Sequence, residues 1–396
     1  MTNPEEYPFW IAFANISGNI LPLKAKYDII IRCCHENGMP LSVFFEYCDE
    51  RLVNDFNLSS EALSAVKTEK QKIPNYSFLA ESMLSQGYEF IPVYDPEYPK
   101  SLKKHLGTHS PVLLYVKGNK KILHKRCTAI VGARNAGSQA MAFTDNIVSL
   151  SVSADSPIVS GYAKGVDRQA FDAAMKYDGE SIIVLPQGIM TFTGFRNLYR
   201  EIINSKVLVI STFQPNAPWN KGLAMARNSI IYALADDIYV AESNDNGGTW
   251  EGVMDGLRKG RRILVRDPEG SEHNANRLLI QKGCIPVSFS GEVLPIVTNH
   301  SLFPEKNQDS TYGHTQARSI LAEPINTYET TTVKLEQKII QLLTENEMNL
   351  QQIKSAVAPD LSDNKLRTVL NSIPGIAVKK QKNRNIYTLM HEQSLF

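Results

Sequence analysis

The stretch Ile158-Val159-Ser160-Gly161-Tyr162-Ala163-Lys164-Gly165-Val166-Asp167 decides the fold of the central part of this chain. Its β-branched start is typical of a buried strand, and the apolar residues that follow recur at helical spacing. Gly161 and Gly165 allow the backbone to turn sharply and to approach a ligand closely. The Ser160 hydroxyl, the Lys164 ammonium group and the free N–H groups of the new helix favour an anion, with phosphate as the first candidate. A tight strand–helix turn with a surface lysine explains these residues equally well.

The same alternation of strand and helix continues on both sides of this stretch. Short apolar runs without inside–outside alternation are typical of parallel strands that are buried on both faces. We expect strands at 128–131, 158–159, 182–185, 207–210, 238–241 and 263–265, and helices near 138–153, 165–177, 196–204, 222–235, 249–260 and 273–282. The sequence therefore predicts an α/β domain over residues 86–295, built on a doubly wound, mostly parallel sheet.

The flanking segments follow other patterns. Residues 1–85 are predicted to form a helical N-terminal domain, in which Ser59-Ser60-Glu61 is expected to cap a helix. Residues 296–332 are polar, lack a sustained period and are predicted to be a linker. In residues 333–396, helical segments precede two short apolar strands around a polar tip at 379–385. This order is typical of a winged helix, so a winged-helix-like domain is expected at the C-terminal end.

Composition and charge exclude several classes of protein. The chain has 396 residues, of which 43% are hydrophobic and 21% charged, and a net charge of +1, which fits an ordinary soluble protein of two or three domains. No apolar run approaches the length of a membrane helix, and the first residues lack the pattern of a signal peptide. Five cysteines without a CxxC pair and scattered histidines give no metal-binding pattern. We expect a cytoplasmic protein with no membrane contact, no metal and no cofactor.

In a parallel sheet, the loops that leave the carboxyl ends of the strands share one edge, where ligands bind. Here these loops, at 132–138, 160–167, 186–188, 211–212 and 242–249, are rich in Gly, Ser, Thr and Asn. With Arg134 and Lys164 among them, they predict a polar crevice that can hold several phosphates. The first loop has the spacing GxxxxGS, but Ser138 stands where a Walker A loop needs lysine. Hydrolysis of ATP through a P-loop is therefore not expected.

Several side chains near this edge allow two interpretations. Arg227 can hold a phosphate bidentately, or it can form a structural pair with Asn228. Asp167 is expected to orient the loops rather than to contact an anion. The aromatic residues beside the loops can stack a base, for about 1–3 kcal/mol each, although packing is the commoner role. They are Tyr162, Phe192, Phe195, Trp219 and Trp250.

A set of motifs in a fixed order points to a known family. They are Gly132-Ala133-Arg134, residues 160–167, Arg227-Asn228, Val240-Ala241-Glu242 and Gly247-Gly248-Thr249. Together with Tyr98-Pro99 and residues 111–118, they make the segment from about 90 to 290 resemble the DNA-processing protein A (DprA/Smf) family. The resemblance implies an extended Rossmann-like fold and a homodimer that binds single-stranded DNA without sequence preference. It also implies loading of a RecA-type recombinase during natural transformation, with no catalytic residue.

The resemblance also assigns positions to the phosphates. It implies contacts at Gly132, Arg134, Ser160, Gly161, Lys164, Gly247, Gly248 and Thr249. The loops themselves add Asn135, Gly165, Arg227 and Asn228 to the candidate DNA-binding residues. Lys164 stands where the family more often has arginine, and Gly247-Gly248-Thr249-Trp250 replaces a Ser-Gly-Ser-Leu-like loop. Such departures fit a divergent relative, for instance one that acts in phage defence.

Two alternatives stay open. The segment 364–390 contains no acidic residue, and its basic residues suit a second DNA surface as well as a solvated face or a protein-docking module. They are Lys365, Arg367, Lys379, Lys380, Lys382 and Arg384. The other alternative is a sensor or enzyme for a nucleotide-derived small molecule, because residues 247–251 loosely resemble a loop of the "lysine decarboxylase-like" nucleoside-monophosphate phosphoribohydrolases. There Arg227 would hold the phosphate and Glu251 would assist glycosidic cleavage.

Overall fold

The computed structural model describes residues 3–270 and 272–295, and shorter stretches between 338 and 389. These stretches are 338–343, 348–357, 376–381 and 384–389, with residues 363, 366, 367 and 370. The chain divides into two compact units, Met1–Leu302 and Phe303–Phe396, and each is described by itself. Within the described residues, no helix is both long and apolar enough to cross a membrane.

The N-terminal part of the first unit is helical, as predicted. Its helices are α1 (Tyr7–Asn15), α2 (Leu23–Ile30), α3 (Ser42–Glu46), α4 (Asp49–Phe56), α5 (Ser60–Gln71) and α6 (Ile73–Ser85). The predicted cap is present, because the Ser59 hydroxyl accepts a hydrogen bond from the Ala62 amide at 3.1 Å, at the start of α5. Phe13, Phe44 and Phe45 pack edge to face in the core of this helical group.

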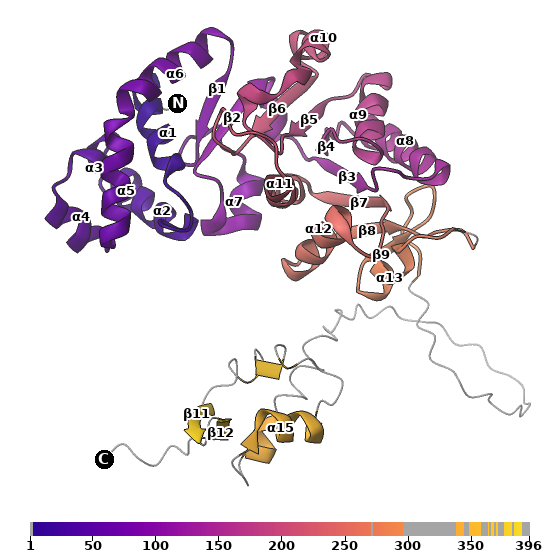
Figure 1. Cartoon of the computed structure of the whole chain (residues 1–396). Coiled ribbons are helices and arrows are strands. Elements are labelled where there is room, and N and C mark those ends of the chain that lie inside the picture. The colour runs from indigo at the N-terminus through magenta and orange to yellow at the C-terminus, as the bar shows by residue number, and fades with distance from the viewer. Residues whose placement is uncertain are drawn as a thin grey trace, which may run out of the picture. The chain divides into compact units, whose positions relative to one another are not determined.

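A nine-stranded sheet forms the centre of the first unit, in the order β1-β2-β6-β5-β4-β3-β7-β8-β9 (Figure 1). The strands are β1 (Glu89–Pro92), β2 (Leu113–Gly118), β3 (Thr128–Gly132), β4 (Ile158–Ser160), β5 (Ser181–Val184), β6 (Val207–Ser211), β7 (Asp237–Glu242), β8 (Ile263–Arg266) and β9 (Ile285–Val287). From β6 to β9 all neighbours are parallel, whereas β1 and β2 pair antiparallel at one edge. The predicted mostly parallel, doubly wound sheet is confirmed.

Helices cover both faces of this sheet (Figure 1). They are α7 (Lys100–Leu106), α8 (Ser138–Ser153), α9 (Val166–Lys176), α10 (Tyr199–Ile203), α11 (Lys221–Leu234), α12 (Gly247–Arg258) and α13 (Asn276–Gln281). Ile130 and Ile158 belong to the apolar cluster under α8 and α9, while Val131 and Val159 belong to the cluster that includes α11. Successive residues of one strand thus enter opposite layers, which explains why the strand runs are continuously apolar.

The chain reverses its direction of travel across the sheet between β3 and β7. It proceeds from β3 outward through β4, β5 and β6, and then returns along α11 to place β7 on the other side of β3. Such a reversal opens a crevice at the carboxyl ends of the two strands, because the loops that follow them turn to opposite faces. The register of β3 and β7 also shifts between Val131 and Gly132, so that Gly132 pairs with Glu242.

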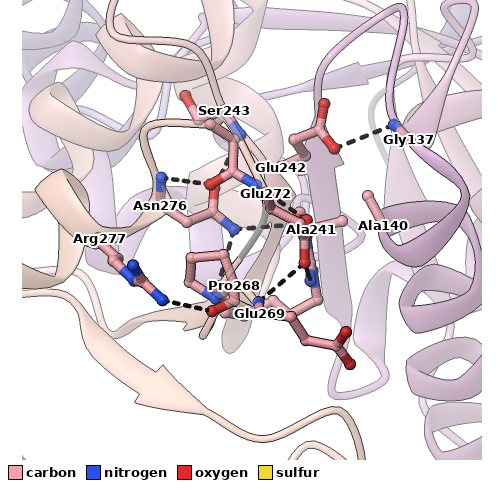
Figure 2. Close-up of polar contacts among 12 residues, drawn as sticks. Gly137, Ala140, Ala241, Glu242, Ser243, Pro268, Glu269, Glu272, Asn276 and Arg277 are labelled. Carbon is pink, nitrogen blue, oxygen red and sulfur yellow. Dashed lines mark hydrogen bonds and ion pairs between the residues drawn. The ribbon is translucent and has the colours of Figure 1, made fainter.

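The ends of β7 and β8 are joined by a buried polar network (Figure 2). The Arg266 side chain, only 2% exposed, donates from Nε to the Ala241 carbonyl oxygen and from both terminal nitrogens to the Glu272 carboxylate. Asn276 donates to the carbonyl oxygens of Ala241 and Arg266 and accepts from the Ser243 amide at 2.9 Å. These hydrogen bonds therefore hold the start of the loop after β7 in place.

The second unit contains a small sheet in the order β10-β12-β11. Its strands are β10 (Met348–Asn349), β11 (Ile376–Gln381) and β12 (Arg384–Leu389), and α15 spans Leu350–Val357. The predicted hairpin is present, but its predicted polar tip is too long. Lys379, Lys380 and Arg384 lie in the strands, because cross-strand pairing extends to Gln381 opposite Arg384. The predicted linker at 296–332 lies outside the described residues, and the winged-helix assignment stays a prediction.

Candidate functional site

Two adjoining hollows lie at the carboxyl edge of the sheet, where the chain reverses. The first has a volume of about 450 Å³ and is lined by the loops after β3, β4 and β7 and by the start of α11. The second, of about 280 Å³, adds Pro186 and Gln187 from the loop after β5. Residues shared by both hollows are Arg134, Ala163, Lys164, Trp219, Ala224 and Arg227. The two hollows are therefore parts of one continuous surface.

The loop after β6 contributes to both hollows through Trp219 near its end, whereas Ser211 and Thr212, the two residues of this loop that were predicted to meet here, line neither. Ser211 is buried, and its hydroxyl donates to the Gln187 carbonyl oxygen at 2.7 Å. This contact supports the loop after β5 from beneath. All five loops thus contribute to the surface, but the loop after β6 does so through Trp219 and not through residues 211–212.

Arg227 lies in the wall between the two hollows. It is only 6% exposed, its Nη1 donates to the Val184 carbonyl oxygen at 2.9 Å, and its Nε finds no partner among the described residues. The guanidinium lies against Gly161, where an added Cβ would sit 1.4 Å from Nη1. Gly161 therefore makes room for the Arg227 guanidinium, and it also lines the second hollow. These contacts are structural but do not include the predicted pair with Asn228, and Arg227 still lines both hollows, so its role toward a phosphate stays a prediction.

Asp167 orients the loop after β4, as expected from its position in the first turn of α9. Its carboxylate accepts from the Gly161 amide at 3.1 Å and also from the amide of Ala163. Burial raises the pKa of Asp167 above its usual value, while the positive charge of Arg227 and the two amides act in the opposite direction. The loop that they hold contains Tyr162 in the left-handed region, with a φ of 56°.

Two of the residues predicted to contact phosphates make packing contacts within the loops. The Ser160 side chain is buried, and its hydroxyl donates to the Asp167 carbonyl oxygen at 3.3 Å. Gly165 has a φ of 90°, and a Cβ there would lie 2.4 Å from the Ala133 carbonyl oxygen. Neither residue lines a hollow. Both serve the close packing of the loops after β3 and β4, because a larger or differently turned residue would collide with that backbone.

Two exposed basic residues, Arg134 and Lys164, line both hollows. Neither forms a salt bridge with a described residue, although the Lys164 ammonium group lies 3.3 Å from the Asn135 side-chain oxygen. Lys221, the first residue of α11, also lines the first hollow and was not among the predicted contacts. Its spacing from Arg227 on the same helix is not the i, i+3 or i, i+4 spacing that places two residues on one face, so the sequence carried no local signal for it.

The N-terminal end of α12 forms the opposite side of the first hollow. Gly247, Gly248 and Thr249 line it, as predicted, and Gly247 has a φ of 86°. Asn228 holds this end by donating from its side-chain amide to the Gly248 carbonyl oxygen at 3.1 Å. Within α12, which is described in full, the first turn contains no acidic residue. Its amides therefore face the hollow without an internal countercharge.

The five candidate aromatic residues separate into two groups. Trp219 is 52% exposed and lines both hollows, and Tyr162 and Phe192 line the second one. Phe195 packs against Phe192 and Tyr88, and neither Phe195 nor Trp250 lines a hollow. Trp219 thus offers the largest free aromatic surface at the site.

The other predicted residues lie apart from this surface or outside the description. Glu251 is exposed and lines neither hollow. In the second unit, Arg367 is exposed, whereas Lys365 and Lys382 lie outside the described residues. Within the described residues, no group of His, Cys, Asp and Glu side chains has the geometry of a metal site.

The fold and the site define a doubly wound α/β protein with a polar, basic ligand-binding surface at its switch point. Residues 89–295 match the family described as DNA recombination-mediator protein A. Because this segment is more than half of the chain, the protein belongs to that family, and the resemblance seen in its motifs is confirmed.

Individual relatives agree with this assignment. The chain is 29% identical over 230 residues to DNA processing protein DprA of Streptococcus pneumoniae. The aligned region covers 55% of this chain and 79% of the relative. The chain is 24% identical over 322 residues to Protein Smf of Synechocystis, covering 74% and 79%. The X-ray structure of DprA from Streptococcus pneumoniae superposes with a TM-score of 0.56 at 22% identity, over 72% of this chain and 95% of that one. The likeness confirms the fold.

The buried contacts of Asp167 with Arg227 and the neighbouring amides give a first testable prediction. Asp167→Asn should lower the free energy of unfolding by about 2 kcal/mol, because it removes the charge that accepts two amides and faces Arg227. Urea denaturation followed by circular dichroism measures the change. Asp172→Asn on the same helix, an exposed partner of Arg168, is the matched control and should cost less than about 0.5 kcal/mol. Equal losses for the two variants would contradict the role given to Asp167.

Proposed function

We propose that this protein binds single-stranded DNA, without sequence preference, along the surface formed by the two hollows. The observation that carries the proposal is the placement of Arg134 and Lys164, exposed and without salt-bridge partners among the described residues, opposite the N-terminal end of α12. Cationic side chains and free helix amides are the groups that hold phosphates. Membership of a family described as recombination mediators makes DNA the natural source of those phosphates.

The shape of the surface favours a strand over a mononucleotide. Arg134 and Lys164 belong to both hollows, so that a phosphate held between them leaves room for a neighbouring nucleotide on either side. Trp219 is also common to both hollows and presents a flat face on which any base can stack. Contacts to phosphates and base faces carry no sequence information, which accounts for the proposed lack of sequence preference.

The wider role is part of the same proposal. The protein would act in DNA recombination as a homodimer in the cytoplasm, with a RecA-type recombinase as its protein partner, in DNA uptake or in phage defence. A binding role is preferred to a catalytic one because Glu251, the acid required for glycosidic cleavage, lines neither hollow. The basic residues of the second unit, among them exposed Arg367, would supply a second DNA contact.

The electrostatic part of the proposal predicts a salt-dependent affinity. Fluorescence anisotropy of labelled oligo(dT) should show binding that weakens steeply between two salt concentrations. Arg134→Ala combined with Lys164→Ala should weaken binding about tenfold at the lower one and reduce the slope of log K against log salt by about 1.4, because two phosphate contacts are lost. Arg258→Ala combined with Lys259→Ala, at the other end of α12, is the matched control and should leave both values unchanged. An unaltered slope in the first variant would refute this use of Arg134 and Lys164.

The stacking part of the proposal depends on Trp219. Trp219→Ala should weaken oligo(dT) binding at least about fivefold, corresponding to the loss of about 1 kcal/mol of base stacking. Trp219→Phe should recover most of the affinity, because it restores an aromatic face. Tyr199→Ala, which removes a 67% exposed aromatic residue on α10 outside both hollows, serves as the control. If Trp219→Ala behaved like this control, the base would have to stack elsewhere.

A further inference from the structure

Glu242, the last residue of β7, accepts hydrogen bonds from two backbone amides of the loop after β3. The Ala133 amide donates to the Glu242 carbonyl oxygen at 2.9 Å. The Gly137 amide donates to the side-chain Oε2 of Glu242 at 3.0 Å, as Figure 2 shows. Gly137 is the N-cap of α8, a helix of 16 residues, and forms no side-chain cap of its own. A carboxylate of this chain therefore sits where the positive end of α8 would attract an external anion.

The strand register brings this carboxylate into position. Val131 of β3 pairs with Val240 of β7, but the next pair is Gly132 with Glu242, so that Ala241 is skipped. Such an irregularity re-aims the side chains that follow it, and here it directs Glu242 toward Gly137. Gly137 has no Cβ, and one added there would lie 3.4 Å from Oε2. This distance is an ordinary van der Waals contact, so the register of the strands, and not the absence of a side chain at residue 137, places the carboxylate at this helix end.

The position of α8 in the fold indicates what the contact between Glu242 and Gly137 does. It follows β3, at the point where the strand order reverses, and doubly wound proteins that bind dinucleotides place the pyrophosphate at this helix end. The loop after β4 is similarly supplied with a carboxylate, from Asp167 in the first turn of α9. By contrast, the first turn of α12, all of it described, holds no acidic residue. Of these three helix ends, only that of α12 has no backbone amide that donates to a carboxylate of a described residue.

We propose that Glu242, which itself lines neither hollow, determines which phosphates bind at this edge of the sheet. Its carboxylate keeps the pyrophosphate group of free nucleotides away from the N-terminal end of α8 and leaves the end of α12 to single phosphodiester groups. The first half of this inference concerns α8 alone, while the second half rests on the proposed function. The protein would thereby bind a DNA strand in a cell that contains an excess of nucleotide di- and triphosphates.

The test compares two neutralising variants with inorganic pyrophosphate as the probe. Glu242→Gln keeps the size of the side chain and removes its charge, and Glu251→Gln makes the same change on an exposed residue of α12 that lines neither hollow. In isothermal titration, Glu242→Gln should bind pyrophosphate about tenfold more tightly than wild type, because a like charge within a few ångströms of the ligand is gone. Glu251→Gln should change the affinity for pyrophosphate less than about twofold, because the charge of an exposed side chain is screened by solvent and salt. Glu242→Ala, which also frees the Gly137 amide, should show the largest rise.

Equal affinities of Glu242→Gln and Glu251→Gln for pyrophosphate would overturn the inference, as would tight binding by the wild-type protein. Thermal melting of the full chain confirms that each variant is folded, and the isosteric Glu242→Gln decides the question if Glu242→Ala does not fold. Oligo(dT) binding is measured in parallel and should rise no more in Glu242→Gln than in Glu251→Gln. Failure of the wild-type protein to bind oligo(dT) would instead contradict the proposed function, and the pyrophosphate comparison would still decide the role of Glu242 at α8.

Discussion

The contact between the Arg227 guanidinium and the backbone of Gly161 is the constraint on which the rest of the site depends. Arg227 comes from α11, its hydrogen bond to Val184 reaches the end of β5, and Gly161 begins the loop after β4. One buried side chain thus ties together a helix and two strand ends. Its positive charge is faced by Asp167, whose carboxylate in turn holds the amides of Gly161 and Ala163. Lys164 owes its place on the surface to this arrangement.

The acidic and the basic groups at the edge of the sheet have different roles. Glu242 and Asp167 both accept hydrogen bonds from backbone amides, although Asp167 also lines the first hollow, so internal contacts hold the loops after β3 and β4 in shape. Arg134 and Lys164 are turned outward and have no salt bridge within the described residues. A chain with a net charge of +1 can therefore present a locally basic surface, because its acidic groups at this edge are already engaged.

Much of the fold could be predicted from the sequence, because strands buried on both faces leave continuous apolar runs. The runs at 207–210 and 238–241 became β6 and β7, and the Ser59 cap is local chemistry that three consecutive residues reveal. The antiparallel pairing of β1 and β2 was not predicted, because a strand's apolar content does not record the direction of its neighbour.

The site was less predictable, because residue type does not record where a side chain points. Ser160 and Gly165 are common in phosphate-binding turns, yet their neighbours use them for packing. The skipped pairing at Ala241 depends on how two distant strands align, and the sequence near Glu242 carries no sign of it. Lys221 was overlooked because its role depends on the path of the loop that precedes α11. Tertiary contacts, not local patterns, settle these positions.

Hydrogen–deuterium exchange of the full chain, with and without oligo(dT), tests the central claim most directly. The account predicts slower exchange on binding for the amides of Gly247–Thr249 and Ala163–Lys164, which line the first hollow, and for Arg134 and Asn135. Amides of β8 and of α6, away from this edge, should be unaffected. Unchanged exchange at these hollow-lining amides, with protection appearing only in the second unit, would show that the strand binds elsewhere and would contradict the account.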